Sequence, residues 1–204
     1  MERIDQILEY WFSNLDENTR LKTDSPLFRR WFGKDEATDR EIRERFEQDF
    51  LRAVPGEFDN WEGSSRGSLA LVLLFDQFPR NMFRGTSRAF QTDPRALTIC
   101  LRSIEEGFDR RLILIQRMFL YMPMMHAESI EVQEKSKQHF GMLVEEARHK
   151  SSVNVEFFAY SYEYAVKHAV IIERFGRYPH RNESLGREST LAEIEFLKGP
   201  DSSF

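Results

Sequence analysis

The chain has 204 residues, of which 41% are apolar, and 18 of them are phenylalanine. This length and composition fit one domain that spans residues 1–204 and has a sizeable aromatic core. The net charge of −5 argues against a general nucleic-acid-binding protein, because that binding depends on neutralising phosphates with basic side chains. The single cysteine, Cys100, excludes an internal disulfide and a cysteine-based zinc site.

The N-terminal residues lack the basic start and apolar run of a secretory signal. The longest strongly apolar stretch, residues 69–75, is too short to cross a bilayer. We therefore expect a cytoplasmic protein that does not interact with membranes. The sequence does not indicate an oligomeric state.

Apolar residues recur with helical spacing along the chain, and no persistent apolar–polar alternation indicates a strand. The pattern predicts an all-α fold of about nine helices joined by short loops. The first three helices cover residues 4–12, 26–32 and 42–53. Ser25 and Pro26 are typical of the N-cap and first position of the second helix.

Residues 69–75 are the most apolar run of the chain. A buried strand would need a partner strand, and the sequence offers none, so a central buried helix is favoured. Pro123 is expected to end a later helix, whereas Thr190 and Glu193 form a capping box that begins the last one. The helices predicted after the apolar run cover residues 93–104, 112–122, 130–148, 155–175 and 190–197.

Two segments, FPRN (78–81) and YPHRN (178–182), share an unusual set of residue types. Each places an aromatic residue, a proline and an Arg-Asn pair just after an apolar segment. Because proline fixes its own φ and restricts the residue before it, we expect two stiff corners with fixed guanidinium and amide directions. If the corners meet, they form an anion-binding hollow. In the alternative interpretation, the arginines cap helix C-termini and pair with surface acids.

Asp76 ends the most apolar run, so its carboxylate must be paired or hydrogen-bonded. It is either a structural partner of an arginine or an acid on the floor of a pocket. His168 is either a satisfied core histidine or a residue that faces the hollow. The candidate ligand-binding residues are Asp76, Arg80, Asn81, Arg84, His126, His168, Arg174, Arg177, His180, Arg181 and Asn182.

The sequence contains none of the common catalytic or cofactor motifs. No two of its five histidines are three or four residues apart, as helical metal ligands often are, so we expect no metal and no cofactor. A Gly-x-Ser-x-Gly elbow, a phosphate-binding loop with its lysine and a dinucleotide-binding glycine pattern are also absent. The pattern therefore identifies no catalytic residue.

Six segments of the chain resemble bacterial family 924 of the domains of unknown function, and the similarity spans essentially the whole chain. They are LEYWF (8–12), WFGKD (31–35), LFDQFPRNMFRG (74–85), RAFQTDP (88–94), RFGRYPHRN (174–182) and LGREST (185–190). The resemblance implies an all-helical fold similar to tetratricopeptide-repeat domains, in which antiparallel helix pairs stack into a right-handed superhelical array. The family name assigns no activity, so the resemblance identifies no catalytic residue.

Our leading hypothesis from the sequence is a binding module. It would hold an anionic small molecule, or an acidic or C-terminal peptide, because arginines make bidentate contacts with carboxylates. The arginines expected to make these contacts are Arg80, Arg84, Arg174 and Arg181.

Two other hypotheses remain open. The protein is an enzyme if a carboxylate and a histidine lie within hydrogen-bond distance in the same hollow. The pairs considered combine Asp76 or Glu128 with His126, His168 or His180. The motifs are purely structural if their arginine and asparagine side chains are fully buried in mutual hydrogen bonds beside no cavity.

Overall fold

The computed structural model describes residues 2–200 and residue 202, and all regular structure in this part of the chain is helical. The all-α prediction is therefore confirmed. None of the described helices is long and apolar enough to span a bilayer. The α-helices are α1 (Arg3–Phe12), α2 (Pro26–Phe32), α3 (Glu36–Ala53), α4 (Ser65–Val72), α5 (Phe78–Met82), α6 (Asp93–Glu105), α7 (Leu114–His126), α8 (Ile130–His149), α9 (Val155–Phe175) and α10 (Leu191–Leu197).

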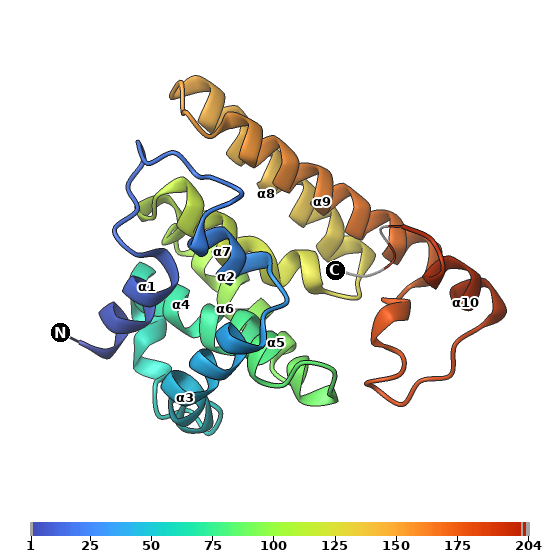
Figure 1. The fold of residues 1–204 in the computed structure, drawn as a ribbon. Helices are drawn as coiled ribbons and strands as arrows, with labels where there is room; N and C mark the ends of the chain where they lie inside the picture. The colour runs from blue at the N-terminus through green and yellow to red at the C-terminus, as the bar shows by residue number, and fades with distance from the viewer. Residues whose placement is uncertain (1, 201, 203–204) are drawn as a thin grey trace.

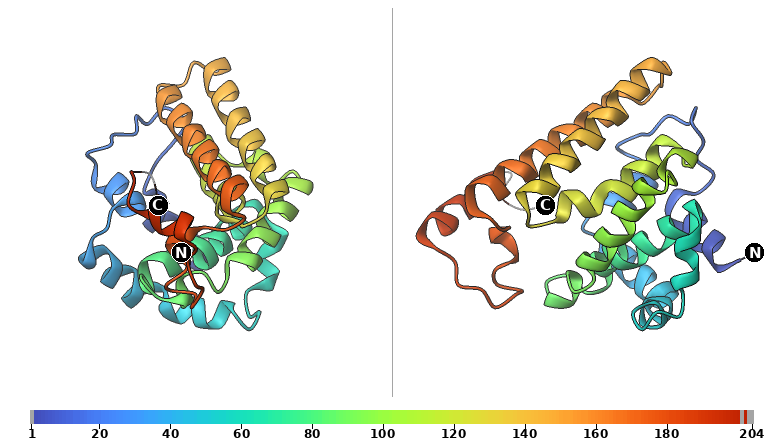
Figure 2. Two further views of the ribbon diagram at one scale, coloured as in Figure 1. Left: turned by 90° about the vertical axis from the view of Figure 1, so that its right-hand side faces the viewer. Right: turned by 180° about the vertical axis from the view of Figure 1, so that it is seen from behind.

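The helix α9 pairs with α8 in a long antiparallel hairpin that lies across one side of the bundle formed by α1 to α7 (Figure 1). The last helix, α10, lies beyond the C-terminal end of α9, at the end of the hairpin opposite its turn (Figures 1 and 2). The right-handed superhelical array of the tetratricopeptide-repeat type stays a prediction.

The core is strongly aromatic, as the phenylalanine content predicts. The ring of Trp11 on α1 lies 5.4 Å from that of Phe78 on α5 and 5.6 Å from that of Phe119 on α7. Phe46 on α3 stacks on Phe78 at 4.7 Å. All four rings are fully buried, so aromatic contacts join α1, α3 and α5 to α7.

Pro123 does not end α7, so that prediction was wrong. The helix continues through the proline to His126, and nearly every residue of α7 is buried. Packing on all sides supports the backbone around the missing hydrogen bond, which an isolated helix could not do. The consequence is that His126 is the last residue of a buried helix.

The segment FPRN (78–81) also forms no corner, contrary to the prediction. The helix that starts with α4 runs without a break into α5 through a π-helical turn, Leu73–Gln77. Pro79 has no N–H for the carbonyl of Phe75, four residues earlier, and the hydroxyl of Thr92 donates to that carbonyl instead, at 2.6 Å. Single π-turns are frequent at functional sites, and this one carries Asp76 and Gln77. Counted with α4 and α5 as one rod, the described helices number nine, as predicted.

The second segment, YPHRN (178–182), does form a corner. Gly176 ends α9 in the left-handed conformation with φ of 67°, which glycine adopts without steric cost. A short 3₁₀ turn, Pro179–Arg181, follows and reverses the chain.

Candidate functional site

A cavity of about 750 Å³ lies among α2, α5, α7, α9 and the corner that follows α9. Its size is that of a site for a small organic ligand. Seven of the predicted site residues line it, namely Arg80, Asn81, Arg84, His126, His168, His180 and Arg181. An eighth, Asp76, is completely buried and hydrogen-bonds to His126.

The two Pro-Arg-Asn segments meet at Asp93, the first residue of α6. Arg80 binds its carboxylate through two hydrogen bonds of 2.9 Å, and Arg181 binds it at 3.3 Å. The two guanidinium groups thus share one carboxylate although they are far apart in the sequence. The protein already supplies an acidic partner for both, which the prediction of an open anion-binding hollow did not foresee.

The Arg181 side chain is buried, and its guanidinium carbon lies 4.7 Å from the ring centre of Phe90 and 4.5 Å from that of Tyr178. These rings hold the guanidinium plane between them. Its Nε makes no hydrogen bond to the described residues. This nitrogen is itself buried, so it does not face the open part of the cavity.

Asp76 and His126 form a carboxylate–imidazole pair in which His126 Nδ1 lies 2.7 Å from Asp76 Oδ1. Gln77 Nε2 donates to the other carboxylate oxygen at 2.6 Å, and Arg80 Nη1 lies 3.2 Å from Oδ1. An ionised carboxylate only accepts hydrogen bonds, so Nδ1 carries the imidazole proton. The other ring nitrogen, Nε2, keeps its lone pair and has no hydrogen-bond partner among the residues that the structure describes.

The charges around this pair favour an ionised aspartate and a neutral histidine. Burial raises the pKa of Asp76, but Arg80, His126 and the hydrogen bonds together outweigh burial and hold that pKa well below its ordinary value. Burial lowers the pKa of His126, and the positive charge of Arg80 lowers it further, against the opposing effect of Asp76. Near neutral pH, Nε2 of His126 is therefore available as a base.

Two further histidines line the cavity. His168 Nδ1 lies 2.8 Å from the carbonyl oxygen of Tyr164, and its ring centre is 6.2 Å from that of His126. Burial, with smaller effects of His126 and Arg181, lowers the pKa of His168 to about 3. Burial and Arg181 lower the pKa of His180 to about 4. Both imidazoles are neutral near neutral pH, so these two histidines add no positive charge to the cavity.

Arg84 and Asn81 both bind Asp39 of α3. Arg84 donates to it through Nε and Nη2, at 2.6 and 2.7 Å, and Asn81 Nδ2 donates at 2.9 Å. These contacts join α5 to the N-terminal turn of α3, so both residues have a structural role at the edge of the cavity.

Three predicted site residues, Arg174, Arg177 and Asn182, do not line the cavity. Arg177 makes a two-pronged ion pair with Glu193 of α10, at 2.7 and 2.8 Å. Asn182 is buried and donates to Ser189 Oγ at 3.0 Å, and Arg174 is exposed. These side chains face the segment that leads to α10, because the chain turns away from the cavity after Arg181.

Glu128, the other carboxylate considered for an acid–base pair, is also used structurally. It accepts two hydrogen bonds from Arg187, at 2.7 and 3.0 Å, and one from the backbone N–H of Tyr178 at 2.8 Å. These contacts attach the corner after α9 to the end of α7.

The candidate residues predicted from the sequence do not include Asp93 and Gln77, which both belong to this site. Asp93 stands before a proline at the start of α6, and its two arginine partners are 13 and 88 residues away. Gln77 had a detectable signal, because it follows Asp76 at the polar end of the most apolar run.

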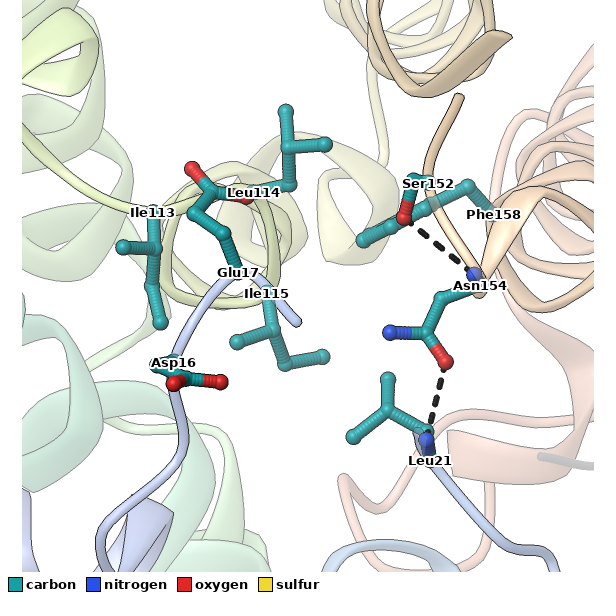
Figure 3. Close-up of a pocket in the computed structure, with 9 residues that line it drawn as sticks. All are labelled: Asp16, Glu17, Leu21, Ile113, Leu114, Ile115, Ser152, Asn154 and Phe158. Atoms are coloured by element: carbon teal, nitrogen blue, oxygen red, sulfur yellow. Dashed lines mark hydrogen bonds between the residues drawn. The ribbon is translucent and has the colours of Figure 1, made fainter. Parts of the chain in front are cut away.

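A second, very small cavity holds no comparable chemistry. Its volume is about 10 Å³, room for a single water molecule. Figure 3 shows Asn154 on one side of it, where the Oδ1 of this residue accepts from the N–H of Leu21 at 2.8 Å. Its Nδ2 donates to the carbonyl of Thr19, so this site fixes the loop before α2 to the α8–α9 turn. No group of three or more potential metal ligands occurs in residues 2–200 and 202.

Comparison with known proteins extends this description. A family model described as "Bacterial protein of unknown function (DUF924)" matches residues 7–201. A solved structure of a protein of unknown function from Agrobacterium tumefaciens is 34% identical and covers 96% of this chain and 97% of its own, with a TM-score of 0.77. A comparison with curated proteins found no significant match.

Proposed function

The chain belongs to the bacterial family of proteins of unknown function DUF924, a description that assigns no activity, and from the site we propose that it is an enzyme. In this proposal His126 is the general base and Asp76 orients it. The observation that carries the proposal is the 2.7 Å contact between a fully buried aspartate and an imidazole that lines a ligand-sized cavity.

The arrangement has the parts that general-base catalysis needs. The carboxylate fixes the tautomer of the imidazole and stabilises the imidazolium that forms when Nε2 takes a proton. Arg80 and Arg181 also line the cavity; Asp93 and Asp76 balance their charges, so they would offer a ligand oxygen N–H donors without a net positive charge. Cys100 is completely buried, and burial raises the pKa of its thiol well above the ordinary value, so a nucleophilic thiolate is not favoured.

The reaction that these parts support best is hydrolysis of an acyl ester or a related bond by water. Nε2 takes a proton from the water while its oxygen attacks the acyl carbon. The imidazolium then returns the proton to the leaving oxygen, which departs as an alcohol, and the acyl group becomes a carboxylic acid.

Replacement of His126 with glutamine tests this proposal. A panel of chromogenic carboxylic, thio- and phosphoric esters is assayed with the wild-type protein and the variant. We expect at least one substrate to be hydrolysed, with kcat reduced about 100-fold or more in His126→Gln. His149→Gln, which changes an exposed histidine on α8, is the matched control and keeps the wild-type rate. Equal rates for the wild type and His126→Gln on every substrate would rule out the catalytic role.

The second candidate function is binding without turnover of an anionic small molecule or an acidic or C-terminal peptide. The guanidinium group of Arg181 favours it, because Arg181 lines the cavity and binds Asp93 through one long hydrogen bond of 3.3 Å. In this case phosphates, carboxylates or acidic peptides raise the Tm of the wild type but not of Arg181→Ala. Arg66→Ala is the control, because its exposed ion pair with Asp5 lies outside the cavity lining. Stabilisation of all three proteins by the same amount would contradict this function.

A further inference from the structure

We propose that the ligand of this cavity is an unbranched amphipathic acyl compound. Its polar head lies beside His126 and Arg181, and its apolar chain extends along α9 toward Phe157. The assignment of the head rests on the proposed function, because His126 would act on that group, whereas the assignment of the chain rests on the other half of the cavity.

Helix α9 forms one wall of the cavity over most of three turns. Five residues of α9 line it, namely Phe157, Tyr160, Ser161, Tyr164 and His168, and their spacing places them along one side of the helix. From residue 157 to residue 168 the helix rises about 16 Å. The cavity is therefore elongated along α9, with the histidine at one end of the wall and the phenylalanine at the other.

The chemistry of the lining changes along this axis. Beside Phe157, the cavity is lined by Phe28, Trp31 and Phe32 of α2, and the rings of Phe28 and Phe157 are 6.4 Å apart. The lining residues of α2 and α9 in this aromatic half carry no charge, and the charged side chain that follows α2 in the lining, Lys34, is exposed. It can gain free energy by covering apolar surface of a ligand.

The polar atoms of this half already have partners within the protein. Trp31 Nε1 donates to the carbonyl of Trp11 at 2.8 Å, and Ser161 Oγ donates to that of Phe157 at 2.9 Å. The hydroxyl groups of Tyr160 and Tyr164 lie 3.0 Å from each other. A sugar or peptide placed here would compete with these hydrogen bonds for partners, whereas a hydrocarbon chain would not.

Two methionines of α7, Met122 and Met125, also line the cavity, and Met122 Sδ lies 3.1 Å from Gln77 Nε2 at the polar end. Methionine is unbranched and flexible, and it adapts to a ligand surface better than a branched side chain does. These two side chains can adjust to a flexible chain of methylene groups that leaves the polar end.

A series of straight-chain carboxylates, which are the products of acyl-ester hydrolysis, tests the proposal. The affinities of butanoate, hexanoate, octanoate, decanoate and dodecanoate are measured by isothermal titration calorimetry, below their micelle-forming concentrations. We expect Kd to fall about fourfold for each added methylene until the chain fills the aromatic half. A Kd that does not depend on chain length would overturn the proposal.

Ser161→Phe should obstruct the cavity about halfway along the wall that α9 forms. The variant is expected to bind butanoate like the wild type but to lose the gain in affinity for the longer chains. Glu163→Phe is the matched control, because it adds the same ring to the same helix at an exposed position outside the lining, and it should keep the full chain-length dependence. Equal effects of the two variants on dodecanoate would also overturn the proposal.

Circular dichroism establishes whether the variants are folded. If Ser161→Phe does not fold, Ser161→Leu, which has a smaller side chain, takes its place. The same titrations in His126→Gln separate the two proposals. If affinity depends on chain length but His126→Gln does not change turnover, the acyl ligand is supported and the catalytic role of His126 is excluded. If His126→Gln loses turnover but affinity does not depend on chain length, the acyl ligand is excluded and the catalytic role of His126 is supported.

Discussion

Replacing Asp76 with alanine is expected to lower the free energy of unfolding by about 3–5 kcal/mol. The carboxylate is completely buried and accepts hydrogen bonds from His126 and Gln77, and it also lies 3.2 Å from Arg80. Removal of the acceptor leaves these buried donors without their shared partner, although Arg80 keeps Asp93. Urea denaturation followed by circular dichroism measures the loss.

The matched control is Asp5→Ala. Asp5 also pairs with an arginine, Arg66 at 2.7 Å, but both side chains are largely exposed. Surface pairs of this kind contribute little, so the expected change is within about 1 kcal/mol. Similar losses for the two variants would mean that burial does not set the importance of Asp76.

The second large effect is a loss of stability in mild acid that depends on His168. The ordinary pKa of histidine is 6.5, and burial lowers that of His168 to about 3 in the folded protein. Above pH 6.5 both the folded and the unfolded states are neutral at this residue, so its contribution to stability is complete. As the pH falls from 6.5 toward 3, the unfolded chain takes up a proton that the folded protein does not. The free energy of unfolding then falls by up to about 1.4 kcal/mol per pH unit.

His180, whose pKa is about 4 in the fold, adds to this slope over the upper part of the same range. Urea denaturation at several pH values from neutrality down toward pH 3 measures how steeply the free energy of unfolding falls. In His168→Gln the free energy of unfolding should fall less steeply with pH, because one histidine no longer contributes. In His149→Gln, which changes an exposed position, the free energy of unfolding should fall as it does in the wild type. Parallel curves for the wild type and His168→Gln would contradict a neutral, buried His168.

The geometry also revises what the arginines do. The sequence suggested that Arg80, Arg84, Arg174 and Arg181 were available to a ligand carboxylate. Arg80, Arg84 and Arg181 instead bind protein carboxylates, at Asp93 and Asp39. The same residues organise the site, since Arg80 contacts both Asp93 and Asp76 and so connects the guanidinium cluster to the catalytic pair that we propose.

Local chain chemistry alone determined most of the helices. Helical spacing of apolar residues located α9 at residues 155–175, and the caps at Ser25 and Thr190 have the predicted hydrogen bonds. These features depend on residues within one or two turns of each other, so the sequence contains the whole cause.

Tertiary packing decided what happens at the prolines and in the site. Pro123 and Pro79 lie inside helices because their surroundings are buried and, at Pro79, because Thr92 supplies the hydrogen bond that proline cannot make. The pairs that form the site are separated by 50 residues for Asp76 and His126 and by 88 for Asp93 and Arg181. Residue types along the chain show which groups need partners, but only the packing of distant helices selects which partners they find and which histidines lose their charge to burial.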